Sequence, residues 1–186
     1  MRALKKTRVL LAVGTLSAAV WAGTFATFTD SGTATSTFTA GTVDLLISSE
    51  TDDAYAFTAI EMSNMKPGDV KYAPLTIANN GTLSFAYTEA TSATNADTKA
   101  LRDQLTLGAK IVANTAACDT AGVGYAASVT TVTASGALSA AAISSRTLAA
   151  GASEVICYKV ELPSGAGDEY QAATTTATMT FSATQS

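Results

Sequence analysis

After residue 41, apolar side chains recur at every second position in one short segment after another. The pattern is clearest in residues 82–92, where Leu83, Phe85 and Tyr87 alternate with small or polar residues, and in residues 154–162. A period of two places these apolar side chains on one face of a β-strand. Turn-forming residues such as Asn79-Asn80-Gly81 separate the segments. The pattern therefore predicts an antiparallel, all-β fold.

We expect about eight strands and one short helix. The strands are predicted at residues 42–49, 55–62, 70–78, 82–92, 105–113, 128–133, 154–162 and 172–184, with a weaker candidate at residues 143–148. Residues 70–78 and 82–92 form the best hairpin-like unit, and Pro74 indicates an edge strand or a bulge. The helix is predicted at residues 95–104, where Asp97 can cap its N-terminus.

Two layers of such strands would make a β-sandwich in residues 42–186. A jelly-roll-like sandwich fits better than an immunoglobulin-type one. The single tryptophan, Trp21, lies outside the predicted strands, so the buried core tryptophan of antibody domains is absent.

Residues 1–26 have the order of a secretory signal peptide. Residues 1–8 are basic, residues 9–22 are apolar, and small residues follow. The apolar run is shorter than the stretch of about 20 residues that a membrane-spanning helix needs. Small residues at Thr24 and Ala26 predict cleavage after Ala26, and cleavage after Thr27 is the alternative. We therefore expect a secreted protein with no membrane segment after cleavage.

The charged residues argue against nucleic-acid binding. The chain has 11 basic and 15 acidic residues, and four of the basic ones lie in the signal peptide. Cleavage would leave 7 basic against 15 acidic residues, a net charge of −8. An acidic chain without a basic cluster is a poor partner for nucleic acid.

The chain contains no histidine. This excludes Ser-His-Asp triads, Cys-His pairs and HExxH zinc sites. The carboxylates are scattered along the predicted loops and lack the spacing of a calcium-binding loop, which favours solvated surface charges. Catalysis by carboxylates or by a Ser-Lys pair stays open, but no spacing singles out such residues. We therefore expect no catalytic residue, no metal site and no cofactor, and we predict that the protein is not an enzyme.

The two cysteines, Cys118 and Cys157, predict one disulfide in an exported chain. It would tie the middle loop to a core strand. Two free thiols, or a cross-link between subunits, are the alternatives.

Residues 27–41 are polar, with Phe28 and Phe38 as isolated aromatic residues and Asp30 as the one charge. Two interpretations are open. The segment is either a disordered N-terminal tail or a strand that awaits a partner, because threonine and phenylalanine favour extended structure.

Several stretches together resemble the TasA/camelysin family of secreted bacterial proteins. The matching residues lie at both ends of the chain and in the predicted turns. They are Gly23-Thr24-Phe25-Ala26-Thr27-Phe28-Thr29-Asp30, Thr37-Phe38-Thr39-Ala40-Gly41-Thr42-Val43-Asp44-Leu45, Met65-Lys66-Pro67-Gly68-Asp69, Ile77-Ala78-Asn79-Asn80-Gly81-Thr82-Leu83, Tyr158-Lys159-Val160-Glu161-Leu162-Pro163 and Thr180-Phe181-Ser182-Ala183-Thr184-Gln185. Residues 93–153 match poorly.

The resemblance implies a jelly-roll subunit of extracellular fibres in the biofilm matrix. It implies a signal peptidase of the SipW type and a head-to-tail homopolymer, in which the N-terminal arm of one copy adds as a strand to the next. Accessory matrix or anchoring proteins are further possible partners. Transferred to this chain, the arm is residues 27–41, and its assembly residues are Phe28, Thr29, Asp30, Thr37, Phe38 and Thr39.

Two other functions remain as alternatives. One is a monomeric, adhesive module of the same fold at the cell surface. The other, which the missing histidine disfavours, is a metallopeptidase of the camelysin type.

Overall fold

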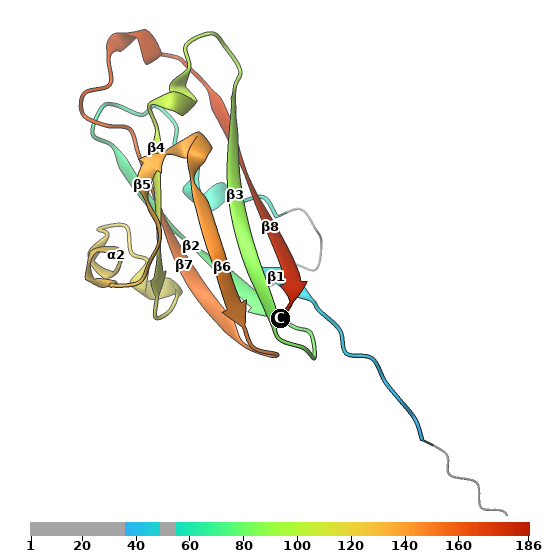
Figure 1. Cartoon of the computed structure of the whole chain (residues 1–186). Helices are drawn as coiled ribbons and strands as arrows, with labels where there is room; N and C mark the ends of the chain where they lie inside the picture. The colour runs from blue at the N-terminus through green and yellow to red at the C-terminus, as the bar shows by residue number, and fades with distance from the viewer. Residues whose placement is uncertain (1–35, 49–54) are drawn as a thin grey trace, which may run out of the picture. The chain divides into compact units, whose positions relative to one another are not determined.

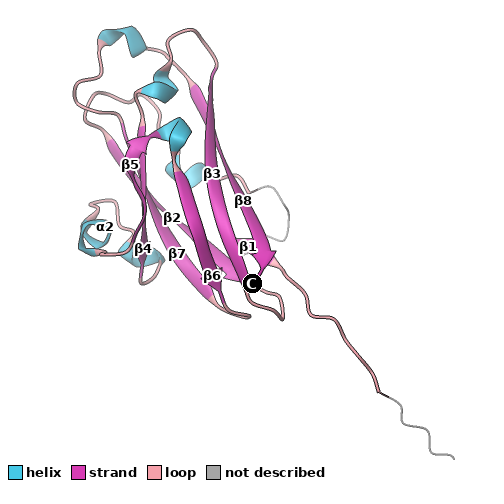
Figure 2. Cartoon of the chain, viewed as in Figure 1, coloured by secondary structure: helices cyan, strands magenta, loops and turns pink. Residues whose placement is uncertain are grey.

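The computed structural model describes residues 36–48 and 55–186. Residues 40–186 form one compact unit, and the described residues 36–39 lie outside it. Eight strands occur in the described residues, and they are coloured magenta in Figure 2. They are β1 (Leu45–Ile47), β2 (Val70–Asn79), β3 (Phe85–Asn95), β4 (Thr106–Val112), β5 (Thr131–Ala137), β6 (Ala142–Leu148), β7 (Ser153–Glu161) and β8 (Thr175–Gln185).

The strands form two sheets that face each other (Figure 1). The five-stranded sheet has the order β1-β2-β7-β4-β5, and the three-stranded sheet has the order β6-β3-β8. Every pairing is antiparallel. Most strands that follow each other in the chain, such as β2 and β3, lie in different sheets, as in a jelly roll, whereas β1-β2 and β4-β5 are neighbours in the five-stranded sheet. The predicted all-β sandwich is confirmed.

The core lies between the two sheets. Alternate residues of the central strands point into it, and the largest side chains that are fully buried there are Tyr87, Tyr158, Phe85, Leu75, Ile77, Leu107, Ile143 and Ile156. This period of two is the alternation seen in the sequence.

The predicted hairpin of residues 70–78 and 82–92 is wrong. Both segments are strands, but β2 pairs with β1 and β7, whereas β3 pairs with β6 and β8. The turn at Asn79-Asn80-Gly81 therefore crosses from one sheet to the other. Pro74 lies opposite Cys157 of β7, and β1 pairs only with the last three residues of β2. In the described residues Pro74 thus has a ladder on one side only, where a missing N–H is tolerated.

The predicted helix at residues 95–104 is also wrong. β3 continues to Asn95, and only Leu101–Asp103 form a 3₁₀ turn. Asp97 accepts a hydrogen bond from the Lys99 N–H, and Ala100 has a φ of 56°, so the chain turns here rather than winding on. The apolar stripe that favoured a helix buries Leu101 and Leu105 in the core instead.

The predicted strand at residues 55–62 is absent. Residues Thr58–Ile60 form a 3₁₀ turn, and the segment makes no ladder. Its apolar side chains Tyr55 and Phe57, and then Ile60 and Met62, are half-buried against the core. The alternation therefore reflected packing on the sandwich rather than pairing within a sheet.

The α-helix found in the described residues is α2 (Val123–Ala127), inside the predicted loop of residues 114–127. One short helix was expected, but at another place in the chain.

Candidate assembly site

The turn between β2 and β3 fixes the start of the domain. The backbone N–H of Thr42 donates to Oγ1 of Thr82 at 2.9 Å, and the carbonyl of Thr42 accepts from the N–H groups of Thr82 and Leu83 at 3.0 and 3.1 Å. The carbonyl of Asp44 accepts from the N–H of Asn80 at 2.9 Å. We call residues 42–44 the arm root, because they attach the N-terminal arm to the sandwich.

Gly81 permits this close approach. A Cβ atom at this position would lie 2.4 Å from the carbonyl oxygen of Thr42 and 2.8 Å from the backbone nitrogen of Asp44. Both contacts are with backbone atoms, which cannot swing away. Any larger residue at position 81 would therefore displace the arm root.

Asn79 holds the turn itself in place. Its side chain is buried, and its amide nitrogen donates to the carbonyls of Leu83 and Leu148 at 2.8 and 3.0 Å. Its amide oxygen accepts from the N–H of Gly81 at 2.9 Å. One side chain thus joins the end of β2, the turn and the end of β6, and both its amide nitrogen and its amide oxygen are hydrogen-bonded. The turn composition and the family-like stretch around Asn79 do not indicate this link to β6.

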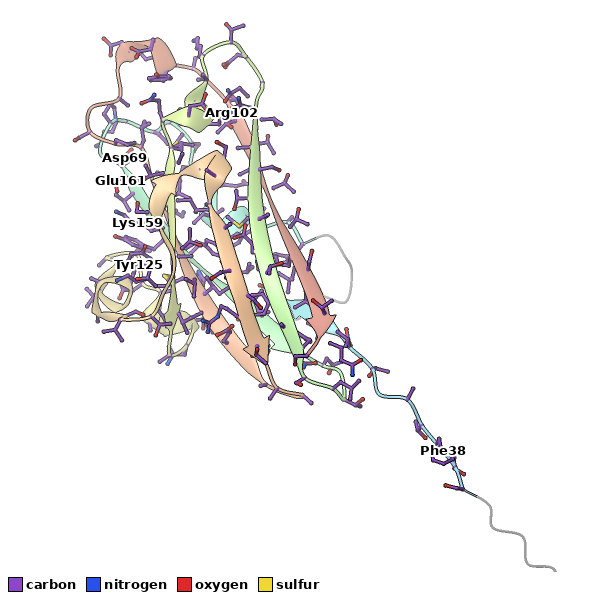
Figure 3. The ribbon with its side chains drawn as sticks, viewed as in Figure 1. Phe38, Asp69, Arg102, Tyr125, Lys159 and Glu161 are labelled. Atoms are coloured by element: carbon purple, nitrogen blue, oxygen red, sulfur yellow. A yellow bond between two sulfur atoms is a disulfide. The ribbon has the colours of Figure 1, made fainter. Side chains whose placement is uncertain are left out.

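The described part of the arm forms no strand. Residues 36–43 are exposed, and the side chain of Phe38, which is labelled in Figure 3, is 91% exposed. The backbone of Thr37, Phe38 and Thr39 therefore makes no strand pairing in the described residues. The predicted cleavage residues Ala26 and Thr27, and the arm residues Phe28, Thr29 and Asp30, lie outside the described residues.

β8 leaves one edge of the three-stranded sheet open. It pairs with β3 over its whole length, from Thr175 opposite Asn95 to Gln185 opposite Phe85, and with no second strand in the described residues. Its inward side chains Met179, Phe181 and Ala183 are only half-buried, whereas the inward residues of β3 are fully buried. Half of the backbone N–H and C=O groups of an edge strand point away from its partner and can bind another strand.

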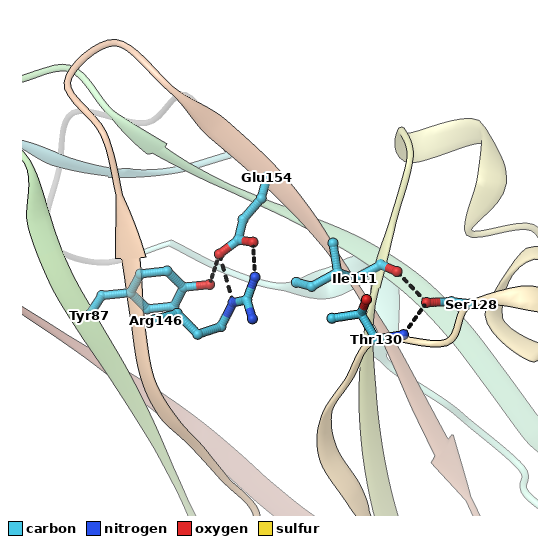
Figure 4. A network of polar contacts seen from close by, with 6 residues as sticks. All are labelled: Tyr87, Ile111, Ser128, Thr130, Arg146 and Glu154. Carbon is cyan, nitrogen blue, oxygen red and sulfur yellow. Dashed lines mark hydrogen bonds and ion pairs between the residues drawn. The ribbon is translucent and has the colours of Figure 1, made fainter.

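An ion pair joins the two sheets (Figure 4). Arg146 of β6 donates from Nε to Oε1 of Glu154 on β7 at 2.9 Å, and from Nη2 to Oε2 of the same carboxylate. The hydroxyl of Tyr87 on β3 donates to Oε1 as well. Burial raises the pKa of Glu154, but the hydrogen bonds from Arg146 and Tyr87 outweigh it and hold this pKa below its ordinary value. The pair therefore stays charged and fixes the spacing of the sheets.

The predicted disulfide between Cys118 and Cys157 is present, with the two Cα atoms 5.4 Å apart. It attaches the loop that carries α2 to the outer face of β7. On that face the ring of Tyr125 packs against Tyr72 at 5.4 Å between centroids, and Lys110 lies 5.1 Å from the centre of the Tyr125 ring. Tyr125 is labelled in Figure 3 beside this loop.

In the part of the chain that the structure describes, the acidic residues do not gather into a metal site. In residues 36–48 and 55–186, no three histidine, cysteine, aspartate or glutamate side chains form a group that could hold a metal ion. Both cysteines are paired in the disulfide, so neither offers a thiolate to a metal ion. The carboxylate of Asp119 instead accepts from the N–H groups of Val123 and Gly124, which lowers its pKa. No helix of the described residues is both long and apolar enough to cross a membrane.

The family described as camelysin metallo-endopeptidase matches residues 4–116, more than half of the chain. A search of curated proteins found no match.

This match contradicts the prediction that the protein is not an enzyme, because the family is described as an endopeptidase. That prediction relied on the missing histidine. Its absence removes the common zinc ligands but leaves carboxylates, which also bind metals, so the exclusion was too broad.

A metallo-endopeptidase implies a metal ion, and the donors in the described residues do not fit one, because they are dispersed or bonded elsewhere. We therefore derive no catalytic step through a metal. The family match itself agrees with the resemblance found in the sequence, and the chain belongs to the camelysin metallo-endopeptidase family.

Proposed function

We propose that the protein is a secreted structural subunit of extracellular filaments in a biofilm matrix or at the cell surface. Each copy donates its N-terminal arm as a strand to the next copy. The exposed N-terminal arm carries the proposal. Residues 36–43 are exposed and belong to no strand, and the side chain of Phe38 is 91% exposed. An exposed aromatic residue on an extended segment is a feature of segments that bind a partner.

The firm arm root supports this role. Pulling on a donated strand transmits force to residues 42–44, which are held to the turn between β2 and β3 by three backbone–backbone hydrogen bonds and one to the Thr82 hydroxyl. A head-to-tail contact of this kind does not close on itself, so it produces a filament rather than a dimer.

Deletion of residues 27–39 from the mature protein tests the proposal. Ala40 and Gly41 stay, because Gly41 lies directly against Leu83. We expect the intact protein to form filaments in electron micrographs and the deleted protein to stay monomeric with unchanged thermal unfolding. Filaments of the deleted protein would refute arm donation.

Point variants refine the same test. Phe38→Ala removes the exposed aromatic ring and should slow filament growth. Val129→Ala is the matched control, because it also shortens an apolar side chain that is 95% exposed but lies outside the arm. A mature protein that stays monomeric under all conditions would favour the adhesive module instead.

The family match supports a second candidate function, an endopeptidase. Its test is cleavage of casein by the purified mature protein, with and without a chelator. Cleavage that the chelator abolishes would establish metal-dependent peptidase activity, and filament formation by the same sample is measured separately.

A further inference from the structure

We propose that the arm of one copy binds the open edge of β8 in another copy, antiparallel to β8, through residues 31–39. This inference rests on the proposed function and adds which edge receives the arm and which way its side chains face. The occupant is a second copy of this chain.

The edge strands of the two sheets differ in how well they are protected against pairing with another strand. Natural proteins protect sheet edges with short strands, bulges, prolines or charged residues. In the described residues β1 has three residues, β5 pairs irregularly with β4, and β6 pairs irregularly with β3 and carries Arg146.

β8 has none of these protections. It runs for 11 residues, TTATMTFSATQ, without a charge, a proline or a shift in register against β3. A long, regular and uncharged edge is a template for another strand. Because all other pairings of the sandwich are antiparallel, we place the arm antiparallel as well.

The outer face of the three-stranded sheet also fits the arm. The outward side chains of β3 and β8 are small, uncharged and mostly hydroxyl-bearing, and nearly all are exposed. They are Ala86, Thr88, Ala90, Ser92 and Thr94 on β3, and Thr176, Thr178, Thr180, Ser182 and Thr184 on β8. Thr88 lies opposite Ser182, and Ser92 lies opposite Thr178, so the hydroxyl groups form rows across the strands.

One side of the arm carries hydroxyl-bearing residues like those on the outer face of the sheet. Every odd position from 27 to 39 is threonine or serine, whereas the even positions hold Phe28, Asp30, Gly32, Ala34, Ser36 and Phe38. In an extended segment odd and even positions face opposite ways. With the odd positions outward, the arm continues the hydroxyl rows of the sheet, and Phe38 faces the half-buried side chains of Met179, Phe181 and Ala183.

Asp30 sets the limit of the pairing. It has the same parity as Phe38, so within the ladder its carboxylate would face the apolar interior, where an unpaired charge is costly. The paired segment therefore ends at Ser31, which leaves Phe28 and Asp30 beyond it.

Cysteine cross-linking between two variants tests the edge and the facing together. One variant carries Thr37→Cys in the arm, and the other carries Thr178→Cys or Thr180→Cys on the outer face of β8. The native cysteines do not interfere, because they are paired with each other. The two variants are assembled as an equal mixture, oxidised mildly and examined on a non-reducing gel.

Three controls define the result. Met179→Cys places the thiol on the inward face of β8, Thr147→Cys places it on β6, and Thr131→Cys places it on β5. We expect a covalent dimer with at least one outward β8 position and none with the controls. As a second measurement that needs no substitution, the amides of β8 should exchange hydrogen more slowly in filaments than in monomers.

The outcomes separate this inference from the proposed function. Filaments that cross-link through Thr147→Cys or Thr131→Cys, or that leave β8 exchange unchanged, would overturn the β8 edge while arm donation stands. A chain that carries both Thr37→Cys and Thr178→Cys gives a further check. A disulfide formed within that single chain would mean that the arm folds back on its own sandwich, which would overturn binding to a second copy. The absence of any filament would refute the proposed function itself.

Discussion

Glu89 is a buried carboxyl group with a hydrogen-bond partner for only one of its two oxygens. It lies on β3 between the sheets and is 2% exposed. One carboxyl oxygen accepts a hydrogen bond from the hydroxyl of Thr91, whereas Oε2 is buried without a partner in the described residues. Burial raises the pKa of Glu89, and the bond from Thr91 offsets only part of this effect. The folded protein therefore holds a proton on Glu89 more strongly than the unfolded chain does.

We predict that Glu89→Gln stabilises the protein at neutral and alkaline pH. The amide has nearly the same shape, keeps an oxygen for Thr91 and cannot become charged. The amide nitrogen that replaces Oε2 stays without a partner, so the gain in the free energy of unfolding comes only from removing the buried charge, and it grows as the pH rises above the unfolded-state pKa of Glu89. Because the pKa is raised in the folded state, the stability from Glu89 is fully present below the unfolded-state value of 4.5 and is lost as the pH rises.

The assay is urea unfolding of both proteins at a series of pH values between about 4 and 8. The difference in stability should be small at the acidic end and should grow by at most about 1.4 kcal/mol per pH unit toward the alkaline end. Glu169→Gln is the matched control, because it makes the same chemical change at an exposed position. Parallel pH profiles for the wild type and Glu89→Gln would refute the argument.

Three further predictions concern the contacts that fix the fold. Replacing both Cys118 and Cys157 with alanine should lower the free energy of unfolding by about 4 kcal/mol in the chain-entropy model, since the two are 39 residues apart; calorimetry measures this loss. Asn79→Ala should cost about 2–4 kcal/mol in urea unfolding, because it leaves buried backbone groups of the turn unpaired, whereas the exposed Asn80→Ala should cost far less. Glu154→Gln should destabilise the protein above the unfolded-state pKa of 4.5, where the ion pair with Arg146 contributes, and should matter less as the pH falls, which unfolding at acidic and neutral pH compares.

The sequence predicted strands well wherever the apolar alternation served a sheet. Residues 154–162 and 172–184 match β7 and β8 to within a few residues, because their inward side chains face one core. The prediction failed where alternating apolar residues pack against the sandwich without pairing in a sheet. Tyr55 and Phe57 alternate like strand residues but lie half-buried against the sandwich without a ladder.

Pairing between strands could not be predicted from local pattern. Asn79-Asn80-Gly81 has the composition of a hairpin turn, yet Asn79 uses its side chain to reach Leu148 at the end of β6. That partner is 69 residues away in sequence, so no local signal indicates it. The open edge of β8 is likewise a property of the two sheet orders rather than of its own residues. The pattern of the arm, by contrast, can be seen in the sequence, because every odd position from 27 to 39 is threonine or serine. Its match to the sheet can be recognised only when the outer face of β3 and β8 is known.

The distance between the arm root and the proposed paired segment limits how two subunits can meet. If pairing ends at Thr39 and the root begins at Thr42, only Ala40 and Gly41 connect them, and two extended residues span about 7 Å. The β8 edge of the next subunit must then lie immediately beside the root, so neighbouring subunits should touch and the filament should be stiff. Insertion of six glycine and serine residues between Thr39 and Ala40 would extend the reach to about 28 Å while leaving both the pairing and the root intact. We expect filaments that still form but bend more sharply in electron micrographs, and filaments of unchanged stiffness would show that the contact does not depend on this short connection.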